Sequence, residues 1–218
     1  MLLKIHPETP SNRQILRTCE TLQKGGIIVY PTDSVYALGC DIYQYRAVAR
    51  IAKLKGISTS KADFSFVFSD LSQLSDYARV MDKRVFRLIK YHVPGPFTFI
   101  LEARRNIPKL FQSKKKTVGI RIPDNNIALE IVRNLGHPIM TTSIHDEKEP
   151  AEYITDPELI WESYKFKVDI VIDGGYGKNT PTTVIDCTTP EPEIIRQGIG
   201  VIKWEILSSE SGGLKLQK

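Results

Sequence analysis

Short apolar runs rich in β-branched residues alternate with helix-like segments along the whole chain, and this alternation most constrains the fold. The runs that indicate strands are residues 27–30, 64–68, 98–103, 118–122, 139–142, 168–172, 182–186 and 194–195. Between them, apolar residues recur at helical spacing, as they do after Ser11, Tyr45 and Asn125. Strands and helices that are interspersed in this way predict one α/β domain with a mixed sheet.

The composition predicts a globular domain rather than a disordered or membrane-spanning chain. The chain has 218 residues, of which 41% are hydrophobic and 25% are charged, and residues 1–207 are expected to form a single domain. Residues 208–218 are rich in Ser, Gly and Lys and are expected to be a disordered tail. No apolar run approaches the roughly 20 residues needed to cross a bilayer. Residues 1–7 also lack the core of a signal peptide, so we expect a cytoplasmic protein.

Charge and cysteine content restrict the ligands. The net charge of +5 suits a phosphate-bearing substrate or RNA. Cys19, Cys40 and Cys187 are far apart and form no C-x-x-C pair, which argues against a disulfide framework and against a zinc site. No metal-binding residues are predicted, and the three cysteines are expected to be buried thiols.

Hydroxyl-rich or basic loops follow several of the predicted strands. Residues 31–34 are Pro-Thr-Asp-Ser, residues 143–145 are Ser-Ile-His, and Arg121 stands among apolar neighbours. Converging hydroxyls, backbone amides and cations make a phosphate site, and α/β proteins usually place ligands at strand ends. The glycine-rich residues 174–178 do not form a Walker A loop, because Gly177-Lys178 leads into a strand and not into a helix.

Each of these residues also has a purely structural interpretation. Taken alone, Thr32 is better explained as a turn former, and Arg121 is explained equally well as the partner of a carboxylate. Lys53 and Lys55 are explained as solvated lysines at a helix end, and His145 as a surface histidine. From the residues alone we predict only an α/β protein that binds an anionic ligand.

Five blocks of sequence, taken in order, resemble the YrdC/YciO family. The first is Tyr-Pro-Thr-Asp-Ser-Val-Tyr-Ala-Leu at residues 30–38, which is similar to the family's signature after its first strand. The others are the Pro-Gly-Pro-x-Thr turn at 94–98, the Arg-x-Pro strand at 119–123, the Pro-Thr-Thr-Val-Ile-Asp block at 181–186 and the Ile-Arg-Gln-Gly block at 195–198. The resemblance therefore covers nearly the whole chain.

The resemblance implies a YrdC/RibB-like fold, in which helices flank a twisted mixed β-sheet around a large basic cavity. It implies a nucleotidyltransferase that makes L-threonylcarbamoyladenylate from L-threonine, bicarbonate and ATP and releases pyrophosphate. This product feeds threonylcarbamoyladenosine formation in tRNA. Such a step needs positioned reactants and cations on the phosphates more than a protein nucleophile. Mg²⁺ would be carried on the phosphates of ATP, without dedicated protein ligands.

The resemblance also implies a role for individual residues. Three of them would act in catalysis: Lys53, Lys55 and Arg121. The nucleotide would contact Lys53, Lys55, Ser143, His145, Thr182 and Arg196. L-threonine would contact Thr32, Tyr36 and Arg121.

Two motifs depart from the synthase pattern and favour the YciO branch of the family. The Lys-x-Arg site is Lys53-Leu54-Lys55, and the Ser-x-Asn site is Ser143-Ile144-His145. Lysine keeps the charge of arginine but loses its bidentate fork. Two alternatives to the synthase stay open: a double-stranded RNA- or tRNA-binding protein with little or altered synthase activity, and a related transferase for another acyl or carbamoyl substrate.

Overall fold

The computed structural model describes residues 1–57, 64–79, 82–104, 107–108, 116–144 and 152–208. Its elements are, in chain order, β1 (Leu2–Lys4), α1 (Asn12–Gln23), β2 (Ile28–Tyr30), β3 (Ala37–Asp41), α2 (Tyr45–Leu54), β4 (Ser65–Val67), α3 (Leu74–Tyr77), α4 (Lys83–His92), β5 (Phe97–Glu102), β6 (Thr117–Arg121), α5 (Asn126–Leu135), β7 (Ile139–Ser143), α6 (Glu152–Thr155), α7 (Pro157–Tyr164), β8 (Ile170–Asp173), β9 (Thr183–Asp186), β10 (Glu193–Arg196) and α8 (Glu205–Ser208).

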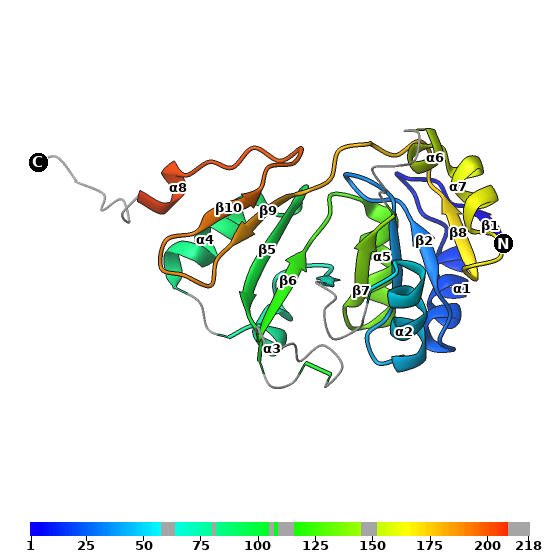
Figure 1. The fold of residues 1–218 in the computed structure, drawn as a ribbon, viewed down its shortest axis with the longest axis horizontal. Coiled ribbons are helices and arrows are strands. Elements are labelled where there is room, and N and C mark those ends of the chain that lie inside the picture. Colours follow the sequence, from blue (N-terminus) through cyan, green and yellow to red (C-terminus); the bar gives the residue numbers. More distant parts are fainter. Residues whose placement is uncertain (58–63, 80–81, 105–106, 109–115, 145–151, 209–218) are drawn as a thin grey trace, which may run out of the picture.

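The strands form one twisted sheet in the order β1-β8-β2-β3-β7-β4-β6-β5-β9-β10 (Figure 1). Four of the neighbouring pairs are parallel and five are antiparallel. The prediction of an α/β fold with helices around a twisted mixed sheet is therefore confirmed.

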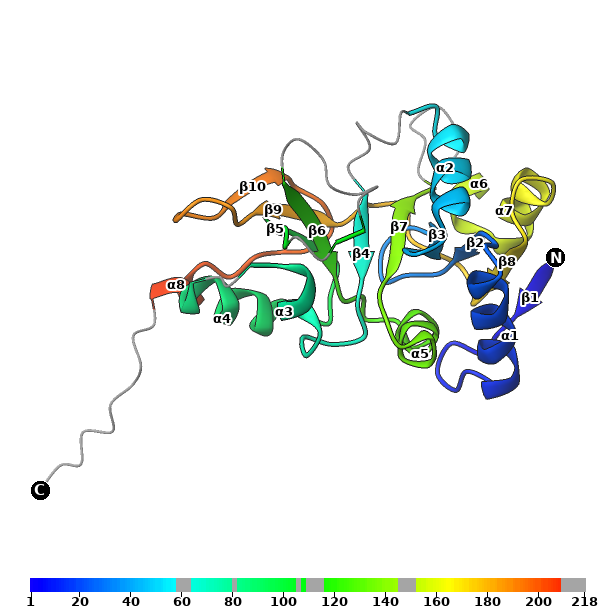
Figure 2. The ribbon, with the colours of Figure 1, turned by 90° about the horizontal axis from the view of Figure 1, so that it is seen from below.

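Helices cover both faces of the half of the sheet that holds β8, β2, β3 and β7. α1 and α5 bury Ile15 and Ile131 against Ile28 on one face. α2 buries Val48 on the other face, in the same apolar cluster as Leu38. Figure 2 shows α1 and α5 on one side of these strands and α2, α6 and α7 on the opposite side. This half is a closed three-layer core that fixes where β2 and β7 end.

The other half of the sheet, β4, β6, β5 and β9, carries helices on one face only. Phe66 of β4 lies there against Tyr77 of α3, with ring centroids 6.1 Å apart. Side chains alternate along a strand, so Ser65, Gly119 and Arg121 point to the opposite face; Ser65 is paired with Gly119. Among the described residues, no helix covers that face over β5, β6 and β9 (Figures 1 and 2). Small and polar side chains therefore lie on this face, and Arg121 among them is buried.

The sequence did not predict β1 or β3. β1 is an edge strand that gains its register from β8, 169 residues further on at Leu2 and Val171. Ser11 is the N-cap of α1, but its side chain makes no capping hydrogen bond. The Gln14 amide in the first turn donates to the carbonyl oxygen of Lys4, which ties the helix to β1.

Side chains also shape other element ends. α3 begins after Gln73, and before it the Asp70 carboxylate accepts the backbone N–H of Ser72 in a turn. Asp82 and Asn125 are the N-caps of α4 and α5, and their side chains accept the backbone N–H groups of Arg84 and Ala128. The tail predicted for 208–218 lies, beyond Ser208, outside the described residues. No helix in the described part of the chain has the length and apolarity that a bilayer crossing requires.

Candidate anion-binding site

The loop between β2 and β3 is folded around its own hydroxyl groups. Thr32 Oγ1 donates to the carbonyl oxygen of Val35 at 2.7 Å and accepts the backbone N–H of Ser34 at 3.1 Å. Thr32, Asp33 and Ser34 are all buried. The interpretation of Thr32 as a turn former is therefore confirmed. The turn also holds two hydroxyls and a carboxylate together beneath the surface.

The guanidinium group of Arg121 contacts the polar side chains of this loop. Its Nη2 atom lies 3.2 Å from Asp33 Oδ1, 3.2 Å from Ser34 Oγ and 3.5 Å from Thr32 Oγ1. Both side chains of the ion pair are buried, with 7% and 6% exposure. Burial raises the pKa of Asp33, and the positive charge of Arg121 opposes that rise. The predicted carboxylate partner of Arg121 is thus Asp33, which the sequence did not single out although it lies in the signature loop.

The Nε–H group of the same guanidinium stays unused. Nε of Arg121 is buried and has no hydrogen-bond partner among the described residues. A buried donor without a partner costs about 1–3 kcal/mol, and hydrogen bonds from a guanidinium group to a carboxylate or phosphate are among the strong ones. The charge and the unpartnered donor of Arg121 therefore favour an anionic ligand.

A second guanidinium group lies close by. Arg196 Nη2 donates to the carbonyl oxygen of Thr182 at 3.0 Å and to its Oγ1 at 3.2 Å. Thr182 Oγ1 in turn lies 2.9 Å from Thr98 Oγ1. Partial burial, and then the positive charge of Arg121, lower the pKa of Arg196. A nearby anion would stabilise the charged form of Arg196.

Of the predicted residues, Thr32 contacts Arg121 and Thr182 contacts Arg196, and the charge of Arg121 acts on the pKa of Arg196. Ser143 ends β7 opposite Ala37, beside the loop. Lys53 lies in the last turn of α2 and Lys55 is its C-cap. Whether these lysines reach a shared ligand stays a prediction. His145 lies outside the described residues.

Tyr36 is fully buried, and its phenol group anchors the glycine-rich segment 174–178. Its hydroxyl donates to the carbonyl oxygen of Gly175 at 2.7 Å and accepts the backbone N–H of Gly174 at 3.3 Å. The backbone N–H of Lys178 donates to the Ser34 carbonyl oxygen at 3.0 Å. These hydrogen bonds therefore connect the glycine-rich segment to the β2–β3 loop and its neighbour Tyr36. Contact between Tyr36 and threonine stays a prediction.

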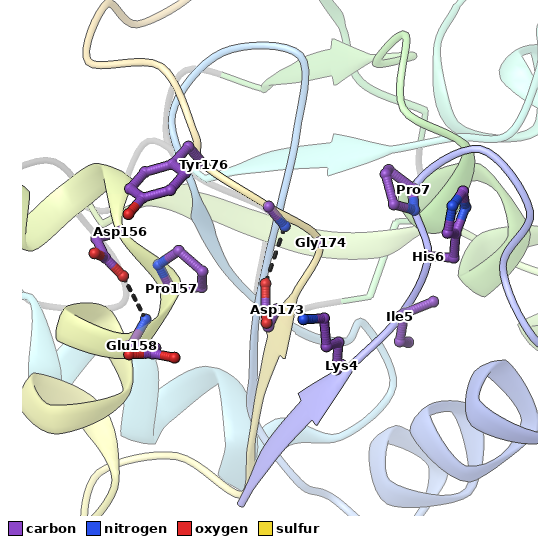
Figure 3. A pocket seen from close by; sticks show the side chains of 11 residues that line it. Lys4, Ile5, His6, Pro7, Asp156, Pro157, Glu158, Asp173, Gly174 and Tyr176 are labelled. Carbon is purple, nitrogen blue, oxygen red and sulfur yellow. Dashed lines mark hydrogen bonds between the residues drawn. The ribbon is translucent and has the colours of Figure 1, made fainter.

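A separate cavity of about 470 Å³ lies between β1, β8 and the start of α7 (Figure 3). Its charged lining includes Asp156, Glu158 and Asp173, with Lys4 opposite. Two of these carboxylates already accept backbone N–H groups, from Glu158 and Gly175. This excess of negative charge does not suit a phosphate. In the part of the chain that the structure describes, no three His, Cys, Asp or Glu side chains are arranged to hold a metal ion.

The sequence profile of the Sua5/YciO/YrdC family, described as telomere recombination, matches residues 20–198. The chain belongs to this family. It is 47% identical over 197 residues to an uncharacterized protein of Haemophilus influenzae, covering 90% of this chain and 94% of the relative. It is 43% identical over 202 residues to YciO of Escherichia coli, covering 91% and 96%. A threonylcarbamoyl-AMP synthase of Nitrosococcus oceani is 30% identical over 179 residues, covering 82% and 95%.

Two solved structures share the fold. The crystal structure of E. coli YciO superposes with a TM-score of 0.85 at 40% identity and covers 93% of this chain and 98% of that one. The Sua5 protein of Pyrococcus abyssi, complexed with L-threonine, gives a TM-score of 0.81 at 26% identity. That match covers 91% of this chain and 57% of Sua5. The family resemblance expected from the sequence, including its nearness to the YciO branch, is confirmed.

Proposed function

We propose that this protein is a nucleotidyltransferase of the threonylcarbamoyl-AMP synthase type, acting on L-threonine, bicarbonate and ATP. The observation that carries the proposal is the buried, unpartnered Nε of Arg121, with Arg196 beside it. Every ligand of the proposed reaction is an anion or carries a carboxylate or phosphate group. The names of the synthase relative and of the threonine-bound Sua5 support this choice of substrates.

In the proposed reaction the amino group of L-threonine combines with bicarbonate to give a carbamate and water. A carbamate oxygen then attacks the α-phosphorus of ATP, the bond from that phosphorus to the oxygen that bridges it to the β-phosphate breaks, and pyrophosphate leaves. Arg121 would hold a carboxylate or phosphate through its unpartnered N–H groups, and Arg196 would lower the cost of the negative charge nearby. Lys53 and Lys55 would reach the triphosphate from the end of α2. Mg²⁺ would arrive on ATP and neutralise the leaving group.

The direct test is pyrophosphate release from ATP in the presence of bicarbonate and each amino acid in turn. We expect release that depends on both bicarbonate and L-threonine and that is abolished in Arg121→Gln. The matched control is Arg133→Gln, which removes an exposed arginine that pairs with Glu130 on α5. ATP binding should also weaken with salt, because charge dominates recognition. Pyrophosphate release that ignores threonine would contradict the proposed substrate.

The two motif departures give a second test. If this chain is a weakened synthase, Lys55→Arg together with His145→Asn should raise pyrophosphate release above that of the natural sequence. Restored motifs without threonine-dependent release would mean that the site serves another acyl or carbamoyl substrate. Binding of double-stranded RNA stays a prediction, which a gel-shift titration at two salt concentrations would check.

A further inference from the structure

The two oxygens of Asp33 are both committed, and they join three elements. Oδ1 pairs with Nη2 of Arg121 at the end of β6. Oδ2 accepts the backbone N–H of Asp124, just before α5, at 3.0 Å. Arg121 is the last residue of β6, and Asp124 lies in the connection from β6 to α5. The carboxylate therefore cannot rotate without losing a contact at each end.

The contacts of Arg121 are also unevenly distributed. Every hydrogen bond from its guanidinium group to a described residue leaves from Nη2, toward Thr32, Asp33 or Ser34. Nε–H, which lies on the same edge as Nη2, is buried without a partner. A planar guanidinium that is held at Nη2 keeps its other N–H groups in a fixed direction. Pre-organisation of this kind improves binding because the ligand does not have to order the side chain.

We propose that Asp33 is a positioning residue, which holds the guanidinium group of Arg121 at Nη2 so that its unpartnered N–H groups keep a fixed direction toward the anionic group of the ligand. The inference rests on the proposed function only for the presence of an anion in this site. It needs neither threonine nor turnover. Asp33 acts through Arg121 and does not touch the ligand.

The proposal predicts that Asp33→Asn weakens the binding of anions, although charge alone predicts the opposite. This substitution removes one negative charge from the site, so charge alone would tighten the binding of anions. An amide has only one acceptor oxygen, however, so either Arg121 Nη2 or the Asp124 N–H would face an N–H donor. We expect the loss of geometry to outweigh the gain in charge. Binding of ATP and of inorganic pyrophosphate should weaken about tenfold, as for a lost charge-assisted contact.

The experiment is calorimetric titration of ATP and of pyrophosphate into the full chain, with melting temperatures as a check on folding. Asp169→Asn is the matched control, because Asp169 also joins a backbone N–H, that of Ile27, to an arginine, Arg50. Asp169 lies outside the site, so we expect Asp169→Asn to bind ATP and pyrophosphate as the natural sequence does. In an Arg121→Gln background, Asp33→Asn should change the dissociation constant by less than about twofold, since its effect passes through Arg121.

Nitrogen-15 NMR of the Arg121 Nε–H group supplies a readout that a merely structural role would not move. We assign the signal by its loss in Arg121→Gln. In the natural sequence it should shift when pyrophosphate is added, and in Asp33→Asn it should be broadened or unresponsive. If Asp33→Asn does not fold, Ser34→Ala removes a weaker contact with Nη2 and should weaken binding about two- to threefold.

Four results would overturn the positioning role. The first is that Asp33→Asn binds ATP and pyrophosphate as tightly as the natural sequence or more tightly, and the second is that Asp169→Asn loses as much affinity as Asp33→Asn. The third is that Asp33→Asn still weakens binding when Arg121 is already replaced by Gln. The fourth is that the Nε–H signal shifts equally on addition of pyrophosphate in the natural sequence and in Asp33→Asn. For the fallback variant, unchanged binding in Ser34→Ala would do the same. A natural protein that binds pyrophosphate but not ATP would refute the proposed function alone. One that binds neither would refute both.

Discussion

Removing Arg121 should destabilise this protein far more than removing an arginine from an equally close pair on the surface. Arg121→Ala leaves the Asp33 carboxylate buried and uncompensated, which costs about 3–5 kcal/mol of unfolding free energy. The comparison is Arg79→Ala. Arg79 Nη1 lies 3.1 Å from Glu102 Oε2, but these side chains are 58% and 52% exposed. Solvent screens such a pair, and its loss should cost under about 1 kcal/mol.

Two further measurements test the cause of that loss. Arg121→Ala combined with Asp33→Asn removes the buried charge and keeps an oxygen for the Asp124 N–H. The double variant should therefore be about 1–3 kcal/mol more stable than Arg121→Ala alone. Burial already raises the pKa of Asp33, and loss of Arg121 should raise it further. The folded state then binds a proton more readily than the unfolded state, so the deficit of Arg121→Ala should shrink as the pH falls.

Urea denaturation of the four proteins at pH 7 and at about pH 4.5 gives the comparison, because the lower value approaches the ordinary range of an aspartate. The Arg79→Ala deficit should not change in the same way, since its carboxylate partner is solvated. The reasoning fails if the two single variants lose the same free energy at pH 7. It also fails if the deficit of Arg121→Ala is the same at both pH values.

Three other perturbations have outcomes that the structure sets. Tyr36→Phe removes the hydrogen bond to Gly175 and should cost about 1 kcal/mol in a urea titration; an unchanged midpoint would contradict a stabilising role for this hydrogen bond. Burial raises the pKa of Cys19 to about 11 and that of Cys187 to about 12, so a thiol reagent at pH 8 should label neither until urea is added. Gly198→Ala places a Cβ 2.3 Å from a backbone oxygen and should lower the melting temperature by several degrees, roughly the effect of a kcal/mol or more.

The strands that the sequence predicted are those whose own residues favour a buried strand. Runs such as Val118–Gly119–Ile120 and Ile139–Met140 are predicted as strands because they are rich in β-branched or apolar residues. β3 does not, because Ala37-Leu38-Gly39-Cys40-Asp41 has low strand propensity and is ordered by pairing with β2 and β7 on both sides. Its conformation is a tertiary effect, which no local pattern carries.

The candidate site shows the same division. The sequence indicated that Arg121 needs an anionic partner, since an arginine in an apolar strand is seldom buried alone. It could not identify Asp33, because that contact depends on how far the β2–β3 loop reaches across β3, β7 and β4 to β6. Arg196 and Thr182 were found through the family blocks. Their hydrogen bonds follow from the antiparallel pairing of β9 and β10.

The position of β8 in the sheet has a consequence for synthesis on the ribosome. β8 lies between β1 and β2, and the amino group of Met1 bonds to Asp169, 168 residues further along. β1 and β2 are therefore synthesised early, and they cannot join the sheet side by side until β8, which lies between them, has been synthesised. Asp33 likewise emerges 88 residues before Arg121. At about 5–20 residues per second that interval lasts on the order of ten seconds. Contacts of such long range form slowly. During this interval the nascent chain contains the β2–β3 loop with Asp33 but not yet Arg121, the cation that pairs with it.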